Sequence, residues 1–305
     1  MRSQARIFGA VEAGGTKFVV AIADEHGQIL LQERFPTTYP AETLAAMTNY
    51  LRQRVAVFGA FAAIGIASFG PVELNPRSPH YGCIGRTPKA GWSGTDVVGA
   101  VAREFSCPVG FDTDTNAAAL AEHRWGAAQG VDNVVYLTIG TGIGGGILID
   151  GVPTHGLMHP EMGHVYPRRH PLDDGFAGVC PFHGDCMEGL ASGPAILART
   201  GALLRELDAA HGQWEIEADY LGQLCALLVV TVSPRRIVMG GGVMSQGRLF
   251  PLVRERTRHW LGGYVDRSEV LTGIDEYVVA PGLGENAGVM GAVALAIDAA
   301  KIRRC

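Results

Sequence analysis

A strand, a glycine-rich turn and an outgoing strand occur twice in this chain, over residues 7–23 and again over residues 133–149. The first turn holds Gly14 and Gly15, and the second runs from Gly140 to Gly146. Glycine supplies 42 of the 305 residues, against a usual share of about 7%, and no collagen-like period accompanies it. The repeat predicts two related lobes that face a cleft and excludes a fibrous chain.

The composition predicts a globular protein that binds neither nucleic acid nor membrane. Apolar residues make up 47% of the chain and charged residues 18%, which leaves ample material for buried cores. The formal net charge of −5 gives no basic surface for nucleic acid. No apolar signal region opens the sequence, and no run approaches about 18 uninterrupted apolar residues. We therefore expect a soluble, cytoplasmic protein.

The hydrophobic pattern predicts an α/β fold. Strands are expected at residues 7–11, 18–23, 28–35, 62–68, 109–111, 133–139, 146–149 and 236–239. Helices are expected at residues 41–57, 93–105, 116–125, 220–232 and 288–300. Ser93 or Thr95 is the expected cap of the second helix. The alanine-rich last helix is expected to pack back on the first lobe.

The first glycine turn has the composition of a phosphate-binding loop. It reads Glu12-Ala13-Gly14-Gly15-Thr16-Lys17. Backbone amides can approach phosphate oxygens there, while Thr16 offers a hydroxyl and Lys17 a positive charge. The order differs from a Walker A loop, and no helix opens behind it as in a dinucleotide-binding fingerprint. An ordinary hairpin turn is the alternative interpretation.

Five glycines fall within the seven positions from Gly140 to Gly146, with Thr141 among them. A hairpin needs only one or two glycines, so this density favours a backbone that surrounds an anion. A third cluster, Gly240-Gly241-Gly242, follows a buried strand and fits a surface for a flat ring or a ribose. Three such clusters on two lobes suit a nucleoside triphosphate held across a cleft.

Two carboxylates follow the strand at 109–111, in the segment Asp112-Thr113-Asp114-Thr115-Asn116. Phosphoryl transfer to a hydroxyl needs a carboxylate that accepts its proton, and open α/β sheets bind ligands at the carboxyl ends of their strands. Asp is also a favoured helix N-cap, so either residue could have only that role. The residues alone leave Asp112 and Asp114 as equal candidates for the base.

A compact run of metal donors spans residues 180–186. Cys180, His183 and Cys186 have the spacing C-x2-H-x2-C and supply the sulfur and imidazole ligands that Zn²⁺ prefers. A tetrahedral site needs a fourth donor, and His164 is a candidate together with His155, His159 and His170. Free cysteines beside solvated histidines are the alternative.

These segments together resemble the ROK sugar kinases, a family within the actin-like, hexokinase-type ATPase fold. The motifs are E-A-G-G-T-K at 12–17, T-I-G-T-G-I-G-G-G at 138–146 and I-V-M-G-G-G-V at 237–243. The resemblance runs from residue 7 to about residue 297. It is greatest for the bacterial, zinc-containing fructokinase branch, because of Glu12 and of the stretch 68–92, which contains S-F-G-P-V, S-P-H-Y-G and T-P-K-A-G-W.

The resemblance implies a two-lobed fold made of duplicated RNase H-like domains. The small N-terminal α/β lobe is expected at residues 1–112, joined by the C-terminal helix 287–305. The large α/β lobe is expected at 113–286, with a zinc-bound loop at 159–188. The resemblance also implies a homodimer.

The family motifs give individual residues a role. They imply that Asp114 is the catalytic base and that sugar hydroxyls are bound by Asn116, Glu161, His164 and Glu188. They imply nucleotide contacts from Glu12, Gly14, Gly15, Thr16, Lys17, Gly140, Thr141, Gly142, Pro194, Gly240, Gly241 and Gly242. Thr113 stands where many family glucokinases carry Asn, which argues against copying glucokinase specificity.

The resemblance also selects His164 as the fourth zinc ligand, since the E-x-G-H motif of the family supplies one. Most members carry C-x-C-G-x-x-G-C, so His183 replaces the middle cysteine here and the loop from His164 to Cys180 is longer. With all four positions filled by His164, Cys180, His183 and Cys186, the zinc is expected to be structural rather than catalytic.

The function that the resemblance implies is phosphorylation of D-fructose to fructose 6-phosphate by MgATP, a fructokinase activity. Fructose is suggested by the stretch 68–92, and a kinase that prefers mannose or glucose is the alternative. A non-catalytic sugar-sensing protein is a second alternative, against which Lys17, Asp114 and the glycine turns argue. The transcriptional repressors of the family carry a helix-turn-helix domain ahead of the kinase-like part, whereas about six residues precede the first strand here.

Overall fold

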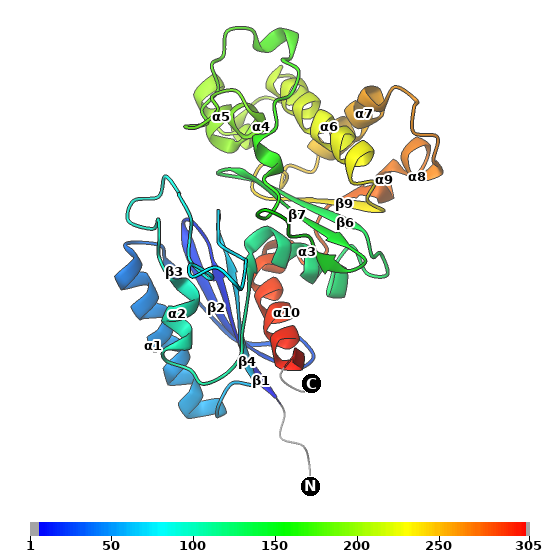
Figure 1. Cartoon of the computed structure of the whole chain (residues 1–305). Helices are drawn as coiled ribbons and strands as arrows, with labels where there is room; N and C mark the ends of the chain where they lie inside the picture. Colours follow the sequence, from blue (N-terminus) through cyan, green and yellow to red (C-terminus); the bar gives the residue numbers. More distant parts are fainter. Residues whose placement is uncertain (1–5, 303–305) are drawn as a thin grey trace. The chain divides into compact units, whose positions relative to one another are not determined.

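A computed structural model of the chain describes residues 6–302. Within them the chain forms two compact units. The first unit consists of residues 6–121, Pro153–His159 and residues 286–302, and the second of Glu122–Val152 and Pro160–Glu285. The chain therefore passes between the units four times (Figure 1).

The first unit is built on a five-stranded sheet in the order β3-β2-β1-β4-β5. β1 is antiparallel to β2 and parallel to β4, and β4 is parallel to β5. All residues of β4 are buried, as expected for a central strand covered on both faces. The bounds are Ile7–Ala13 for β1, Lys17–Asp24 for β2, Ile29–Pro36 for β3, Ala63–Ser68 for β4 and Val109–Thr113 for β5.

Four helices belong wholly or partly to the first unit: α1 (Pro40–Phe58), α2 (Val97–Ala102), α3 (Asp114–Trp125) and α10 (Ala287–Ile302). The alanine-rich α10 packs on β1, β4 and β5, which confirms the expectation that the last helix returns to the first lobe. Glycine makes this approach possible, because a Cβ at Gly65 would lie 1.9 Å from the carbonyl oxygen of Ala292. A Cβ at Gly110 would lie 2.4 Å from that of Leu295.

The second unit repeats the same strand order, β10-β9-β6-β7-β8. β6 is antiparallel to β7 and parallel to β9, as β1 is to β2 and β4. The bounds are Val134–Ile139 for β6, Ile143–Ile149 for β7, Val152–Pro153 for β8, Arg236–Gly240 for β9 and Val278–Val279 for β10. The matching order confirms the duplicated α/β fold.

Helices cover the second sheet, and the long α6 packs against α7 (Figure 1). The helices are α4 (Met187–Ala191), α5 (Gly193–Thr200), α6 (Gln213–Thr231), α7 (Leu249–Leu261), α8 (Ser268–Leu271) and α9 (Ile274–Tyr277). Short 3₁₀ turns are η1 (Met162–His164), η2 (Pro171–Asp173), η3 (Leu204–Glu206) and η4 (Gly284–Asn286). No helix within residues 6–302 is both long and apolar enough to cross a membrane.

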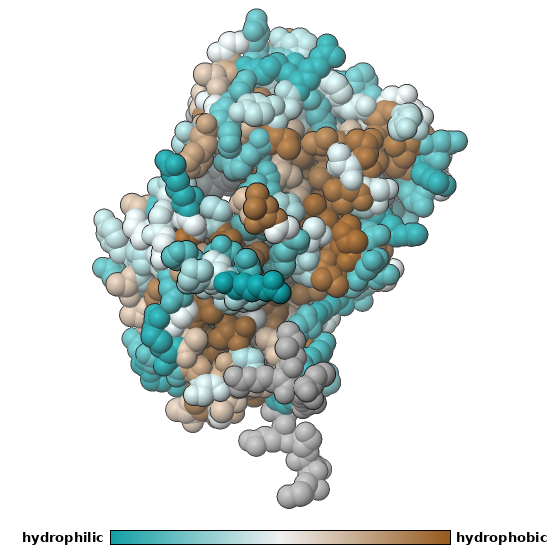
Figure 2. All heavy atoms as spheres, viewed as in Figure 1, coloured by the Kyte–Doolittle hydropathy of each residue, from teal (hydrophilic) through white to brown (hydrophobic). Residues whose placement is uncertain are grey.

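Figure 2 shows hydrophobic surface on the second unit, over the region where Figure 1 labels α6, α9 and β6. On α6, Leu227 and Val230 contribute to the exposed hydrophobic residues. The buried face of the same helix carries Tyr220, Leu221 and Leu224 into the core of this unit. α6 is therefore apolar on more than one side.

The structure corrects three expectations. The helix expected at 93–105 is only Val97–Ala102, and its cap is Asp96, whose carboxylate accepts a hydrogen bond from the Gly99 amide at 2.6 Å. The outgoing strand expected at 146 begins at Ile143. The division expected at residue 112 falls after Ala121, because α3 packs closely on α10: a Cβ at Gly291 would lie 2.3 Å from the backbone of Ala117.

The expected domain assignment differs at one further place. Pro153–His159 belongs to the first unit, although it lies inside the range 113–286 expected for the large lobe. Residues 303–305 of the expected C-terminal helix lie outside the described residues.

Candidate functional site

The turn between β1 and β2 leaves an open backbone beside an exposed lysine. The Gly14 amide donates to the Lys17 carbonyl at 3.0 Å, and the Thr37 hydroxyl donates to the Gly14 carbonyl at 2.7 Å. Thr16 and Lys17 are exposed, and a Cβ built on Gly15 would meet no atom of the described residues within 4 Å, its chain neighbours aside. The turn is thus held in shape by its own backbone and by the Thr37 side chain, while its outer face can accommodate an anion.

Glu12 lies on β1 just before this turn. Glycine at position 288 makes room for it, since a Cβ there would lie 2.5 Å from its carboxylate. Burial raises the pKa of Glu12, and the positive charges of Lys17 and Arg34 act in the opposite direction. The Glu12 carboxylate therefore lies near the positive charge of Lys17, at the end of the turn.

Asp112 and Asp114 differ in environment. Asp112 is 2% exposed, and its Oδ1 accepts hydrogen bonds from the Thr113 amide at 2.7 Å and from Nδ2 of Asn116 at 2.8 Å. Asp114 is the one residue between Phe111 and Glu122 that is not buried. It is the first residue of α3, and its Oδ1 accepts a hydrogen bond from the Thr115 amide at 2.8 Å. Of the two carboxylates, only that of Asp114 is accessible to a ligand.

Asn116, which the resemblance gives a sugar contact, is fully buried. Its backbone amide donates to the Thr113 hydroxyl at 3.0 Å, while its side chain donates to Asp112. These bonds hold the turn between β5 and α3, so they favour a role in shaping the turn. The sugar contact of Asn116 stays a prediction.

In the second unit, the turn after β6 meets the third glycine cluster and the start of α5. The Gly193 amide donates to the Gly140 carbonyl at 2.8 Å, and the Val243 amide donates to the Ile139 carbonyl at 3.0 Å. Gly241 has a φ of 92°, and a Cβ on it would lie 2.3 Å from the Ile139 carbonyl oxygen. The structure thus brings together the predicted nucleotide contacts of this unit: Gly140, Thr141, Gly142, Pro194, Gly240, Gly241 and Gly242.

Two carboxylates lie next to this turn. Oε2 of Glu188, on α4, accepts a hydrogen bond from the Ile143 amide at 3.0 Å. Glu161 lies near this carboxylate. Burial raises the pKa of Glu161 to about 7, with a second contribution from the negative charge of Glu188. Glu161 and Glu188, both predicted to bind sugar hydroxyls, therefore converge in the second unit.

The segment Glu161-Met162-Gly163-His164 packs directly on β7. A Cβ at Gly163 would lie 1.9 Å from the Ile143 carbonyl oxygen, and one at Gly145 would lie 2.2 Å from the sulfur of Met162. The small residues on both sides allow this approach. Gly144 and Gly145 belong to β7, paired with Thr138 and Leu137 of β6, rather than to the turn in which they were expected.

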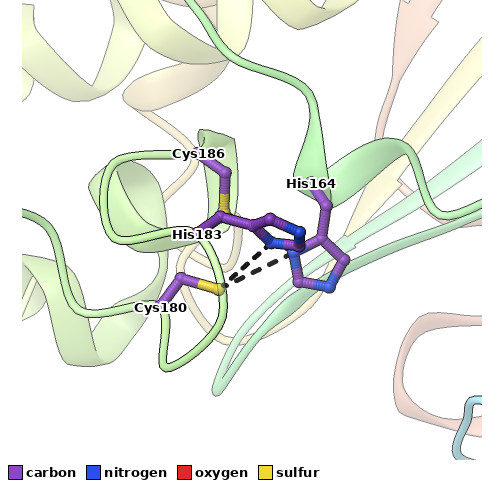
Figure 3. Close-up of side chains that lie close together, drawn as sticks. All are labelled: His164, Cys180, His183 and Cys186. Atoms are coloured by element: carbon purple, nitrogen blue, oxygen red, sulfur yellow. Dashed lines mark hydrogen bonds between the residues drawn. The ribbon is translucent and has the colours of Figure 1, made fainter.

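Four potential metal ligands lie close together at the end of this segment (Figure 3). His164 ends η1, and Cys180, His183 and Cys186 come from the loop that leads into α4. Nδ1 of His164 lies 3.5 Å from Sγ of Cys186 and 3.8 Å from Sγ of Cys180, and Nδ1 of His183 lies 3.6 Å from Sγ of Cys180. All four donor atoms lie within 4.8 Å of one another.

These distances fit a tetrahedral zinc ion. Zn–S bonds of about 2.3 Å and Zn–N bonds of about 2.0–2.1 Å place a sulfur and a nitrogen donor about 3.5 Å apart. The three rival histidines lie elsewhere. His155 bonds Asp112, His159 accepts a hydrogen bond from the Val72 amide, and Nδ1 of His170 accepts one from the Leu172 amide.

The long loop between His164 and Cys180 is anchored by a buried ion pair that the sequence did not indicate. Arg199 of α5 binds both carboxylate oxygens of Asp173, at 2.7 and 3.0 Å, and the Tyr220 hydroxyl donates to the same carboxylate at 2.7 Å. Arg199 also donates to the Leu190 carbonyl of α4 at 2.7 Å. One side chain thus joins the loop to the helix that carries Glu188. These residues are widely separated in sequence and form no motif, so no local signal pointed to them.

Comparison with known proteins gives one consistent match. The model of the ROK family matches residues 8–299. A fructokinase from Zymomonas mobilis is 47% identical over 302 residues, which cover 98% of this chain and 99% of that protein. A fructokinase from Pediococcus pentosaceus is 42% identical, covering 97% of this chain and 99% of that protein.

A solved structure supports the same fold. It is a ROK family glucokinase from Streptomyces griseus in complex with glucose and AMPPNP, 28% identical to this chain. The TM-score is 0.72, and the match covers 96% of this chain and 99% of the glucokinase.

Proposed function

The chain belongs to the ROK family and is an ATP-dependent sugar kinase of the fructokinase type, and we propose that it phosphorylates the 6-hydroxyl of D-fructose with Asp114 as the base. The sequence identity of 47% and 42% to two fructokinases, over nearly the full length of the chain, supports fructose as the substrate. The accessible carboxylate of Asp114, in an otherwise buried turn, supports the base. That partly exposed carboxylate is the structural observation on which the proposal depends most.

A carboxylate in this position suits a phosphoryl transfer. A sugar hydroxyl attacks the terminal phosphorus and loses its proton, which a nearby carboxylate accepts. Asp112 is a poor candidate because Thr113, Asn116 and His155 already bind its oxygens. Asp114 is less buried than Asp112, and its Oδ1 accepts a hydrogen bond from the Thr115 amide.

The two glycine turns are proposed to bind the phosphates of MgATP. Gly14, Gly15, Thr16 and Lys17 offer backbone amides, a hydroxyl and an ammonium group in the first unit. Gly140, Thr141 and Gly142 offer the same kind of backbone in the second. Gly140 lies next to Gly242 and to the start of α5, which contains Pro194. This arrangement supports a surface that binds the rest of the nucleotide.

Glu161 and Glu188 are proposed to bind sugar hydroxyls. Carboxylates accept paired hydrogen bonds from vicinal hydroxyls, and these two carboxylates lie close together. His164 is proposed to contact the sugar through the ring nitrogen that does not bind metal. Each of these contacts would orient the sugar without taking part in proton transfer.

His164, Cys180, His183 and Cys186 would hold a zinc ion that supplies structural cross-linking of the loop, with no position left for a reacting group. His164 lies at one end of the segment 164–186, and the three other ligands lie at or near its other end. Glu161 precedes this segment and Glu188 follows it. The proposed role of the metal site is therefore to fix the spacing of the two carboxylates.

Phosphorylation of mannose or glucose is the alternative within the same reaction. The Streptomyces griseus relative binds glucose, which keeps this alternative open for a related fold. We also propose a homodimer, which the family resemblance supports and which light scattering on the purified protein tests.

An ADP-release assay with D-fructose, D-mannose and D-glucose tests the proposed function. We expect the highest kcat/KM with fructose, and fructose 6-phosphate as the product by ³¹P NMR. A preference for mannose or glucose would support the alternative kinase. ADP release that no hexose stimulates would support the sugar-sensing alternative and contradict a kinase.

A further inference from the structure

The segment Pro153–His159 is part of the first unit although both of its flanks belong to the second. It is fastened at its end by His159, which is buried and whose Nε2 accepts a hydrogen bond from the Val72 amide at 3.1 Å. Its other polar anchor is His155, whose Nε2 lies 2.8 Å from Oδ2 of Asp112. The segment thus places the imidazole of His155 next to Asp112, which immediately precedes the turn that leads into Asp114.

Asp112 connects that imidazole to the turn. Its Oδ2 faces His155, while its Oδ1 accepts hydrogen bonds from the Thr113 amide and from the Asn116 side chain. The Asp112 side chain is 3% exposed and that of His155 is 43% exposed. A buried carboxylate without a partner is strongly destabilising, so the imidazole stabilises the charge on which both other bonds depend.

The direction of the pKa shift of His155 agrees with this role. The hydrogen bond that the imidazole donates to Asp112 raises the pKa of His155, burial lowers it by a smaller amount, and the charge of Asp112 raises it further. A protonated imidazole donates through Nε2 to the carboxylate, which makes the bond charge-assisted and stronger than a neutral one.

We propose that His155 is a positioning residue for phosphoryl transfer: through Asp112 it holds the Asn116 amide and the turn between β5 and α3, and so fixes the carboxylate of Asp114. This inference rests on the proposed role of Asp114. Loss of the imidazole removes the hydrogen bond to Oδ2 of this buried carboxylate and lets the carboxylate rotate. Rotation weakens the bonds to Thr113 and Asn116 and loosens the turn that Asp114 begins.

The test compares His155→Ala, His155→Gln and the control His26→Ala. Glutamine retains an N–H donor near the position of Nε2, so it can still bond Asp112. His26 is an exposed histidine of the same unit, and its hydrogen bond to Asp24 uses only the backbone. We expect His155→Ala to lower kcat by about tenfold or more, because small displacements of reacting groups are costly. The KM for ATP and the zinc content should stay unchanged, and His155→Gln should recover most of the rate.

A second readout follows the turn without using activity. The chain has five asparagines, at positions 49, 75, 116, 133 and 286, so ¹⁵N-asparagine labelling gives few side-chain signals. We expect the Asn116 side-chain resonances to shift or broaden in His155→Ala, to return in His155→Gln and to be unaffected in His26→Ala.

Two results would overturn the inference. In the first, the Asn116 resonances of His155→Ala are the same as in the wild type. In the second, these resonances change but kcat does not. A wild-type protein that phosphorylates no hexose would instead overturn the proposed function. The Asn116 resonances would then decide by themselves whether His155 holds the turn.

Discussion

The carboxylate of Glu188 accepts a hydrogen bond from the backbone amide of Ile143 over 3.0 Å. This bond fastens a proposed sugar ligand on α4 to the end of the glycine turn that follows β6. A Cβ at Gly142 would lie 2.5 Å from the same carboxylate oxygen, so glycine in the turn is a condition for the contact. In the second unit, a direct hydrogen bond therefore links the proposed sugar ligand Glu188 to the proposed phosphate-binding turn.

Glu188→Gln should separate the two roles of this carboxylate. The amide oxygen can still accept the hydrogen bond from Ile143, so Tm should stay close to that of the wild type. The KM for fructose should rise by about tenfold or more, because a hydrogen bond to a charged acceptor is worth about 1.5–3 kcal/mol. Glu215→Gln, an exposed carboxylate on α6, is the control. An unchanged KM in steady-state kinetics would show that Glu188 does not bind the sugar.

Gly15→Ala should weaken ATP binding without loss of stability. A Cβ at this position meets no protein atom within 4 Å, so the fold can accept it. The added methyl group occupies space that phosphate oxygens need, and we expect the KM for ATP to rise by about tenfold. Gly212→Ala is the matched control, since its Cβ also meets nothing and it lies outside the proposed site. Equal ATP affinity in the two variants would argue against phosphate binding by the first turn.

Cys186→Ser should remove the metal and destabilise the second unit. We expect one zinc per chain in the wild type and in Cys83→Ser, whose cysteine lies outside the cluster, and none in Cys186→Ser by elemental analysis. A loss of about 3 kcal/mol corresponds to a fall of about 6–12 °C in Tm for a domain of this size. Zinc retained by Cys186→Ser at wild-type stability would show that the cluster is not the metal site.

Glu217 should make the protein less stable as the pH rises. Its carboxylate is fully buried, and Oε1 has no hydrogen-bond partner among residues 6–302. Burial raises its pKa well above the ordinary value of 4.5, against the lowering effect of the Arg199 charge. Above pH 4.5 the unfolded chain releases this proton while the folded chain retains it. Stability is therefore lost progressively as the pH rises toward the folded-state pKa.

Glu217→Gln removes this linkage. Its stability relative to the wild type should increase between pH 6 and pH 8, by at most about 1.4 kcal/mol per pH unit. Urea unfolding across that range measures the effect, with Glu215→Gln as the exposed control on the same helix. Parallel pH profiles for Glu217→Gln and the wild type would mean that Glu217 is ionised in the folded protein.

Hydrophobic pattern and turn chemistry predicted most strands and the helices α1, α3 and α10, because each repeats a local rule. They predicted α6 only from Tyr220 onward and did not predict α7. Where a tertiary contact decides the structure, the same rules failed. Gly144 and Gly145 were expected in the turn, yet they are strand residues because Met162 and Gly163 pack against β7. The helix expected from Ser93 starts at Val97 because Asp96 caps it.

The candidate site shows the same limit. The residues alone could not distinguish Asp112 from Asp114, since burial separates them and burial depends on the packed unit. The fourth metal donor was one of four histidines by spacing, and only the fold brings His164 to the cysteines. The bond between His155 and Asp112 joins residues far apart in sequence, so no local pattern could predict it.

The turnover of Asp114→Asn with fructose tests the central claim most directly. We expect kcat to fall by about 10²–10⁴-fold, the usual contribution of a general base. Binding of fructose and of ATP by calorimetry, zinc content and Tm should match the wild type, as should every property of the exposed control Asp150→Asn. Near-normal turnover in Asp114→Asn would contradict the assignment of Asp114 as the base.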